Sequence, residues 1–192
     1  MDRDGSRSGL LDARQVHPAS YASAMDDHDP AGRARLTAQL DPIGVEYELF
    51  ACDPDLADTA AFCAAYDVTM EESANCVVVA GKREGVTRYA ACVILATTRA
   101  DVNGVVRRRL DVRKASFAPM AEAVELTGME YGGITPVGLP EGWPVWIDAR
   151  VAATDRVIIG SGIRGSKIEL PGAALAQLPG AEVVEHLARP VG

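Results

Sequence analysis

The sequence predicts an α/β domain of the α+β type, in which a mixed β-sheet is flanked by a few helices. Short apolar or alternating runs of strand length recur along the 192 residues, and glycine, proline and aspartate turns separate them. Helical segments are fewer and do not alternate regularly with the strands, so a doubly wound sheet is not expected. A hydrophobic content of 48% is sufficient for one sizeable core.

The expected strands are short and bounded by turn residues. They cover residues 45–52, 76–80, 89–96, 145–148, 157–160, 163–170 and 181–185, and residues 112–117 are expected to be extended. The segment 81–85 contains two glycines and is expected to be the loop of a hairpin between the second and third strands.

The expected helices begin and end at recognisable residues. They cover 31–40, 55–66, 101–110, 119–127 and 171–178. Asp101 can cap the third helix and Gly128 ends the fourth. Residues 1–28 lack an apolar face and are expected to form a disordered or loosely attached tail, which leaves residues 29–192 as one domain.

The numbers and positions of the charged residues, histidines and cysteines restrict the classes of function that this chain can have. The net charge of −8 disfavours broad nucleic-acid affinity, yet five basic residues gather in one short segment. The segment is read either as a solvated helix face or as a docking surface for phosphates, and it contains Arg107, Arg108, Arg109, Arg113 and Lys114. With three histidines and no C-x-x-C pair, no metal site, cofactor or histidine-based nucleophile is expected. The four cysteines are expected to be buried free thiols.

The chain contains no apolar run of the roughly 18 residues that a membrane span needs. Its first residues also lack the apolar stretch of a secretory signal. The sequence therefore predicts a cytoplasmic protein without a membrane partner.

Two glycine-rich loops, residues 132–139 and 160–165, are the candidate binding elements. Glycines permit close approach of the backbone to a small ligand, and an arginine can hold a phosphate or carboxylate. The candidate binding residues are Gly132, Gly133, Thr135, Pro136, Gly160, Ser161, Gly162 and Arg164.

The order of three motifs resembles the YbaK/ProX family of aminoacyl-tRNA editing domains. These motifs are Leu-Thr-Gly at 126–128, Gly-Gly-Ile-Thr-Pro-Val-Gly-Leu at 132–139 and Gly-x-Gly-x-Arg-Gly at 160–165, and the resemblance spans roughly 57–188. It implies a curved mixed sheet with flanking helices, as in the domain associated with prolyl-tRNA synthetase. It also implies hydrolysis of mischarged aminoacyl-tRNA without a metal, in a pocket that selects small amino acids. The basic cluster would then dock tRNA.

The chain departs from this family pattern at Asn75, because the family commonly places a lysine at this strand position. An amide offers only neutral hydrogen bonds, whereas charge-assisted bonds are roughly twice as strong. Three readings remain, of which the first two are a trans-editing deacylase in which Asn75 occupies the catalytic position and a non-catalytic module that binds aminoacyl-tRNA or nucleotide. A protein-interaction domain is a third. Lys82 and Lys167 are alternative sources of the missing charge.

Overall fold

The computed structural model describes residues 30–191. The expected tail at residues 1–28 lies outside them. The helical segments are α2 (Pro30–Leu40), η2 (Asp41–Ile43), η3 (Pro54–Leu56), α3 (Thr59–Tyr66), η4 (Val102–Val106), α4 (Arg107–Arg109), α5 (Met120–Thr127), α6 (Ala149–Ala152) and η5 (Gly172–Gln177). The strands are β1 (Glu48–Ala51), β2 (Ala74–Arg83), β3 (Val86–Leu95), β4 (Thr98–Ala100), β5 (Ala115–Phe117), β6 (Val145–Asp148), β7 (Val157–Gly160), β8 (Ser166–Leu170), β9 (Ala181–Val184) and β10 (Ala188–Pro190).

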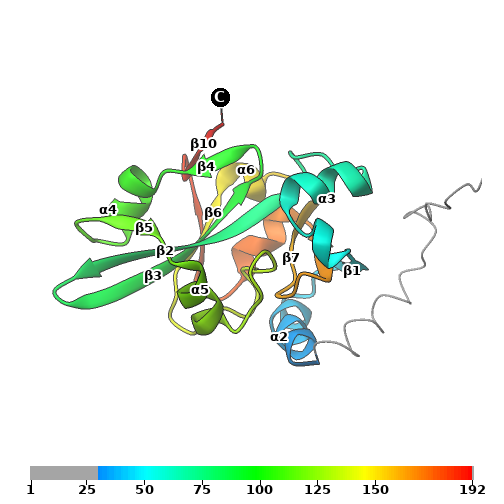
Figure 1. Cartoon of the computed structure of the whole chain (residues 1–192), viewed down its shortest axis with the longest axis horizontal. Coiled ribbons are helices and arrows are strands. Elements are labelled where there is room, and N and C mark those ends of the chain that lie inside the picture. The colour runs from blue at the N-terminus through cyan, green and yellow to red at the C-terminus, as the bar shows by residue number, and fades with distance from the viewer. Residues whose placement is uncertain (1–29, 192) are drawn as a thin grey trace, which may run out of the picture.

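The main sheet has five strands in the order β5-β2-β3-β6-β9. Its β5, β2 and β3 strands pair antiparallel, whereas β6 lies parallel to both β3 and β9. The long β2–β3 hairpin crosses the molecule, with α5 on one side of it and α4 on the other (Figure 1). The predicted mixed sheet with flanking helices is therefore confirmed.

A second sheet joins the first where the pocket described below is formed. Its three strands are antiparallel in the order β1-β8-β7. A parallel bridge between Ser73 and Ile158 connects β7 to the start of β2, and the Ile158 N–H donates to Glu72 O at 2.7 Å. The bridge fixes the beginning of β7 beside the residue that precedes β2.

The two faces of the main sheet bury different cores. Ile147 and Val145 pack with Leu36 of α2 and the β7–β8 sheet, whereas Trp146 packs with Val106 on the opposite face. Because successive side chains of a strand point to opposite faces, β6 contributes to both cores.

The β2–β3 hairpin is longer than predicted. The strands continue to Arg83 and resume at Val86, so the loop is only Glu84-Gly85. These two residues have φ of 52° and 82°, the left-handed conformation that two-residue hairpins favour. The prediction that Gly81 belongs to the loop is wrong, because Gly81 is part of β2.

The predicted helix at 101–110 is also irregular. The Asp101 carboxylate caps it by accepting hydrogen bonds from Gly104 N and Val105 N, both at 3.2 Å. The first five residues form a π-helical turn, and only Arg107–Arg109 is α-helical.

The strands β4 and β10, three residues each, are too short to show a period in the sequence.

Candidate functional site

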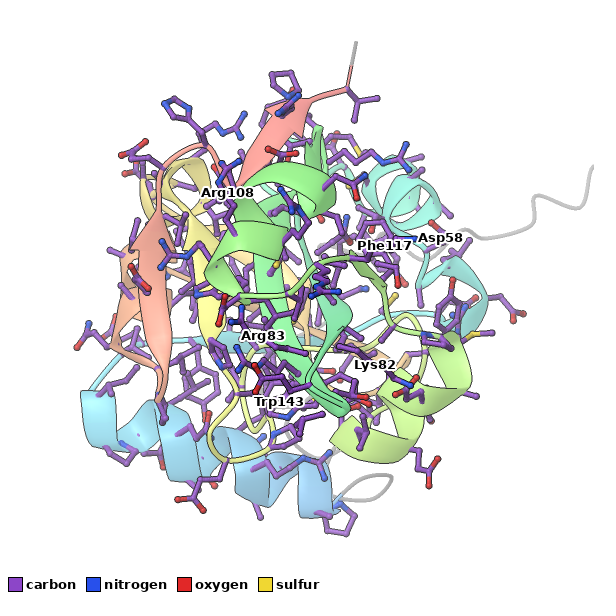
Figure 2. All side chains as sticks on the ribbon, turned by 90° about the vertical axis from the view of Figure 1, so that its left-hand side faces the viewer. Asp58, Lys82, Arg83, Arg108, Phe117 and Trp143 are labelled. Carbon is purple, nitrogen blue, oxygen red and sulfur yellow. The ribbon has the colours of Figure 1, made fainter. Side chains whose placement is uncertain are left out.

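A pocket of about 640 Å³ lies at the edge of β2, between the start of α3, strand β5 and the glycine loops. Asp58 precedes α3 and Phe117 ends β5; both residues line the pocket and are labelled in Figure 2. Much of the wall is apolar, with contributions from Val78, Ile134 and Ile158. The pocket can therefore enclose a small ligand with both polar and apolar parts.

The edge of β2 is open where it lines the pocket. Strand β5 pairs with β2 at Val79–Gly81, and Ala118 N donates to Val78 O at 2.9 Å. Because backbone groups on an antiparallel strand alternate in direction, those of Cys76 point to the same side as Val78 O. The N–H and C=O of Cys76 therefore face the pocket beyond the end of β5.

Asn75 lines this pocket and is half-buried. Its Oδ1 atom accepts a hydrogen bond from Thr59 Oγ1 at 2.7 Å. The Asn75 amide nitrogen is the remaining donor that this side chain can offer a ligand. The catalytic role of Asn75 stays a prediction.

The charges of the pocket are mostly positive. Among its described lining residues are three cations, Arg99, Arg164 and Lys167, and one carboxylate, Asp58. Arg99 is exposed at the pocket rim, whereas Lys167 is 7% exposed. A positive cavity in a chain of net charge −8 favours a ligand with negatively charged oxygens.

Arg164 also holds the second glycine loop in place. Its Nε atom donates to Pro54 O at 3.0 Å, and Nη1 donates to Tyr131 O at 3.4 Å. The guanidinium therefore ties the second glycine loop to the segment before α3 and to the residue preceding the first glycine loop. A planar group with several fixed donors suits this bridging position.

The two glycine loops pack backbone against backbone. Gly162 N donates to Gly133 O at 2.7 Å. A Cβ atom at Gly133 would lie 2.6 Å from the carbonyl of Ile163, and one at Gly160 would lie 2.4 Å from Gly133 O. These distances leave no room for a side chain, so the loops require glycine for their contact with each other.

Some of the candidate binding residues line the pocket, and the others, called frame residues below, belong to the glycine loops without lining it. Gly132, Gly160 and Arg164 line the pocket. The other candidates do not line it and support the loops from behind; they are Gly133, Thr135, Pro136, Ser161 and Gly162.

Two frame residues show why the sequence could not separate these groups. Ser161 is 1% exposed, and its hydroxyl donates to Ser166 O at 2.9 Å. Thr135 is also 1% exposed. A glycine-rich motif predicts close backbone approach without saying whether the approaching group is a ligand or a second loop.

The basic cluster is only partly free to bind. Arg109 forms an ion pair with Glu182 and lies over the Trp146 ring at 5.3 Å, while Arg107 Nε donates to Asn103 O at 2.8 Å. The exposed members are Arg108, Arg109, Arg113 and Lys114, of which Arg108 is marked in Figure 2.

Of the two alternative lysines, Lys82 is exposed on β2 outside the pocket, and Lys167 is buried in the pocket wall. Sequence reasoning missed Arg99 because it lies in the short strand β4. An arginine that follows two threonines is not a motif that predicts a binding site.

The four cysteines are free thiols, three of them buried and Cys76 half-buried. Within residues 30–191, no group of three or more His, Cys, Asp and Glu side chains is placed to hold a metal ion. No helix in this described part is long and apolar enough to cross a membrane.

Comparisons with known proteins agree with this architecture. A solved hypothetical protein superposes with a TM-score of 0.71 at 22% identity, covering 81% of this chain and 99% of its own. A protein proposed to be a trans-editing enzyme for prolyl-tRNA synthetase superposes with a TM-score of 0.67 at 21% identity, covering 82% and 96%. A search of curated proteins finds no match. The family model of the aminoacyl-tRNA editing domain matches residues 53–178, more than half of the chain. The chain therefore belongs to the aminoacyl-tRNA editing domain family.

Proposed function

We propose that this protein is a trans-editing deacylase, which hydrolyses the ester between a small mischarged amino acid and tRNA. The observation that carries the proposal is a pocket with an apolar wall, three cations and an open strand edge, in a chain of the editing-domain family. We also propose a cytoplasmic location for this activity.

The pocket residues suit the two ends of such a substrate. Arg99 at the exposed rim can pair with the terminal phosphate of the tRNA. The apolar residues Val78, Ile134 and Ile158 can receive the side chain of the amino acid. The ester then lies between these regions, near Asn75 and the backbone of Cys76.

The hydrolysis needs a water molecule and groups that stabilise charge on the ester. Water attacks the carbonyl carbon, the bond to the ribose oxygen breaks, and the water proton is transferred to that oxygen. The backbone N–H of Cys76 is placed to donate to the substrate, and such preorganised donors stabilise developing negative charge. None of the described residues that line the pocket is a histidine.

A second candidate function is a non-catalytic module that binds aminoacyl-tRNA or nucleotide in the same pocket. The observation that favours it is Asn75, whose carbonyl oxygen is already occupied by Thr59. The two candidates differ in turnover alone, because both need the pocket.

The decisive measurement is deacylation of a panel of labelled aminoacyl-tRNAs by the full chain. Multiple turnovers on at least one tRNA carrying a small non-cognate amino acid are expected. Binding without hydrolysis on every member of the panel would establish the non-catalytic module, and the absence of binding would overturn both functions.

We further predict that the exposed basic residues dock the tRNA body. Changing both Arg108 and Arg113 to glutamate is expected to weaken the binding of all tRNAs similarly. It should also reduce the magnitude of the slope of log K against log salt by about 2. Filter binding at several salt concentrations measures both effects.

The control is Arg156→Glu, which reverses an exposed arginine that pairs with Glu169 outside the cluster. An unchanged salt slope in the Arg108/Arg113 double variant, with the same affinity as this control, would reduce the cluster to a solvated surface.

A further inference from the structure

Lys167 of β8 is a buried cation whose hydrogen-bonding capacity is mostly unused. The side chain is 7% exposed, and its Nζ atom lies 5.3 Å from the centre of the Phe62 ring. A lysine ammonium carries three N–H donors, and among the described residues only Ala57 O accepts one, at 3.0 Å. A buried charge is costly without partners, so its retention indicates a ligand that supplies them.

The groups around Lys167 do not neutralise it. Cys52 and Cys63 are nearby, but burial raises the pKa of both thiols and keeps them uncharged. Asp58 faces the lysine from the start of α3 but is exposed, and Arg164 faces it with a like charge. Burial, assisted by Arg164, lowers the pKa of Lys167 although the Cys52, Cys63 and Asp58 groups act in the opposite direction.

The lysine reaches the same part of the pocket as Asn75. Lys167 bonds to Ala57 O, and Asn75 bonds to the hydroxyl of Thr59 two residues later. Lys167 also pairs across the second sheet with Gly160, another pocket residue. The side chains of Asn75 on β2 and Lys167 on β8 therefore converge on the segment before α3 from two different strands.

We propose that Lys167 supplies the positive charge of the pocket and donates a hydrogen bond to the carbonyl oxygen of the bound ester. This inference rests on the proposed deacylase function and names the group that compensates for Asn75. Lys167 is deep in the pocket, whereas Arg99 is exposed at the rim. The depth assigns the lysine to the enclosed ester and the arginine to the solvated phosphate.

The ammonium acts on the oxygen as charge develops there. When water adds to the carbonyl carbon, the electron pair of the C=O bond moves to the oxygen, and Lys167 stabilises the resulting oxyanion. When the bond to the ribose oxygen breaks, the pair returns and the carboxylic acid forms. Such a donor contributes about a hundredfold to kcat in comparable oxyanion sites.

Lys167→Met is expected to lower kcat about 100-fold while leaving the free energy of unfolding unchanged or raised, because it removes a buried unpaired charge. Deacylation kinetics and urea unfolding of the full chain measure the two effects. The control is Lys82→Met, which removes an exposed lysine from β2 and is expected to retain full activity.

The pH dependence distinguishes the ammonium from a packing role. The ammonium is present below the pKa and is lost above it, so the ratio of wild-type to Lys167→Met rates should fall as pH rises through the lowered pKa. In the double variant Asn75→Lys, Lys167→Met, a cation from β2 should restore at least a tenth of the lost rate. A constant ratio across pH, or no recovery in the double variant, would contradict the proposal.

Failure of the proposed function is separable from failure of this inference. If the wild-type chain hydrolyses no aminoacyl-tRNA, the deacylase proposal fails and binding decides the role of Lys167. The probe is an aminoacyl-adenosine in which an amide replaces the ester, measured by calorimetry. Several-fold weaker binding by Lys167→Met, but not by Lys82→Met, would support the lysine as the ligand-binding cation. Equal affinities would overturn it.

Discussion

Replacing Asp148 by alanine is expected to lower the free energy of unfolding by about 3 kcal/mol. The Asp148 side chain is 1% exposed and accepts four hydrogen bonds. Three come from Arg150, through its backbone N–H at 3.0 Å, Nε at 2.8 Å and Nη2 at 3.0 Å, and the fourth comes from Ala188 N at 2.9 Å. Alanine would leave the buried Ala188 N–H without this partner, which adds to the loss of the ion pair.

Urea unfolding of the full chain measures this loss, and Arg156→Gln is the matched control. Arg156 pairs with Glu169 at the surface, with side chains 42% and 28% exposed. Exposed pairs contribute at most about 1 kcal/mol, so the control should be nearly neutral. Equal unfolding midpoints for Asp148→Ala and the wild type would show that Asp148 does not hold β6 to the start of β10.

The same carboxylate makes stability depend on acid pH. Burial by itself would raise the pKa of Asp148, but the hydrogen bonds from Arg150 and Ala188 outweigh it and lower the pKa. A carboxyl with a lowered folded pKa stabilises the fold above its unfolded value, about 3.9, and this contribution disappears as pH falls through the folded pKa. Asp148→Asn should therefore flatten the acid branch of the stability curve, although Asp101, whose pKa is also lowered, keeps part of the dependence.

The sheet could be predicted from the sequence because its strands are apolar and bounded by turn residues. The strand at 145–148 was predicted with the bounds that β6 has. The short strands β4 and β10 could not be predicted, because three residues show no period. Strand β10 pairs antiparallel with β4, and its first residue, Ala188, bonds to Arg150 and Asp148, which are 38 and 40 residues away along the chain.

The site could be predicted only where a motif marks it. The glycine loops are candidates because of their residue types and order, and Asn75 is a candidate because it stands where the resembled family places a lysine; Asn75 lines the pocket. Lys167 was named as an alternative charge, but nothing in the strand pattern placed it inside. Its burial follows from the pairing of β8 between β1 and β7, a tertiary contact that local sequence does not encode.

Gly160→Val is expected to lower the free energy of unfolding by about 3 kcal/mol and to abolish ligand binding in the pocket. A Cβ atom at this position would lie 2.4 Å from Gly133 O and 2.8 Å from Ile134 O, both backbone atoms. Overpacking of this kind typically costs about 1–3 kcal/mol, and a branched side chain is at the upper end. Because Ile134 lines the pocket, the displaced loop also changes the apolar wall.

Gly165→Ala in the same loop is the matched control, since the nearest atom to its Cβ is Ile163 Cδ1 at 4.0 Å. Gly165 does not have the positive φ that disfavours alanine, so this variant should be neutral or more stable by about 0.5 kcal/mol. Urea unfolding and binding of the amide analogue separate the two effects. Gly160→Ala, with one methyl group, should lie between them. A Gly160→Val variant as stable as Gly165→Ala, and still able to bind the analogue, would mean that the two loops can separate without losing the site. The glycines would then serve ligand approach and not the contact between the loops.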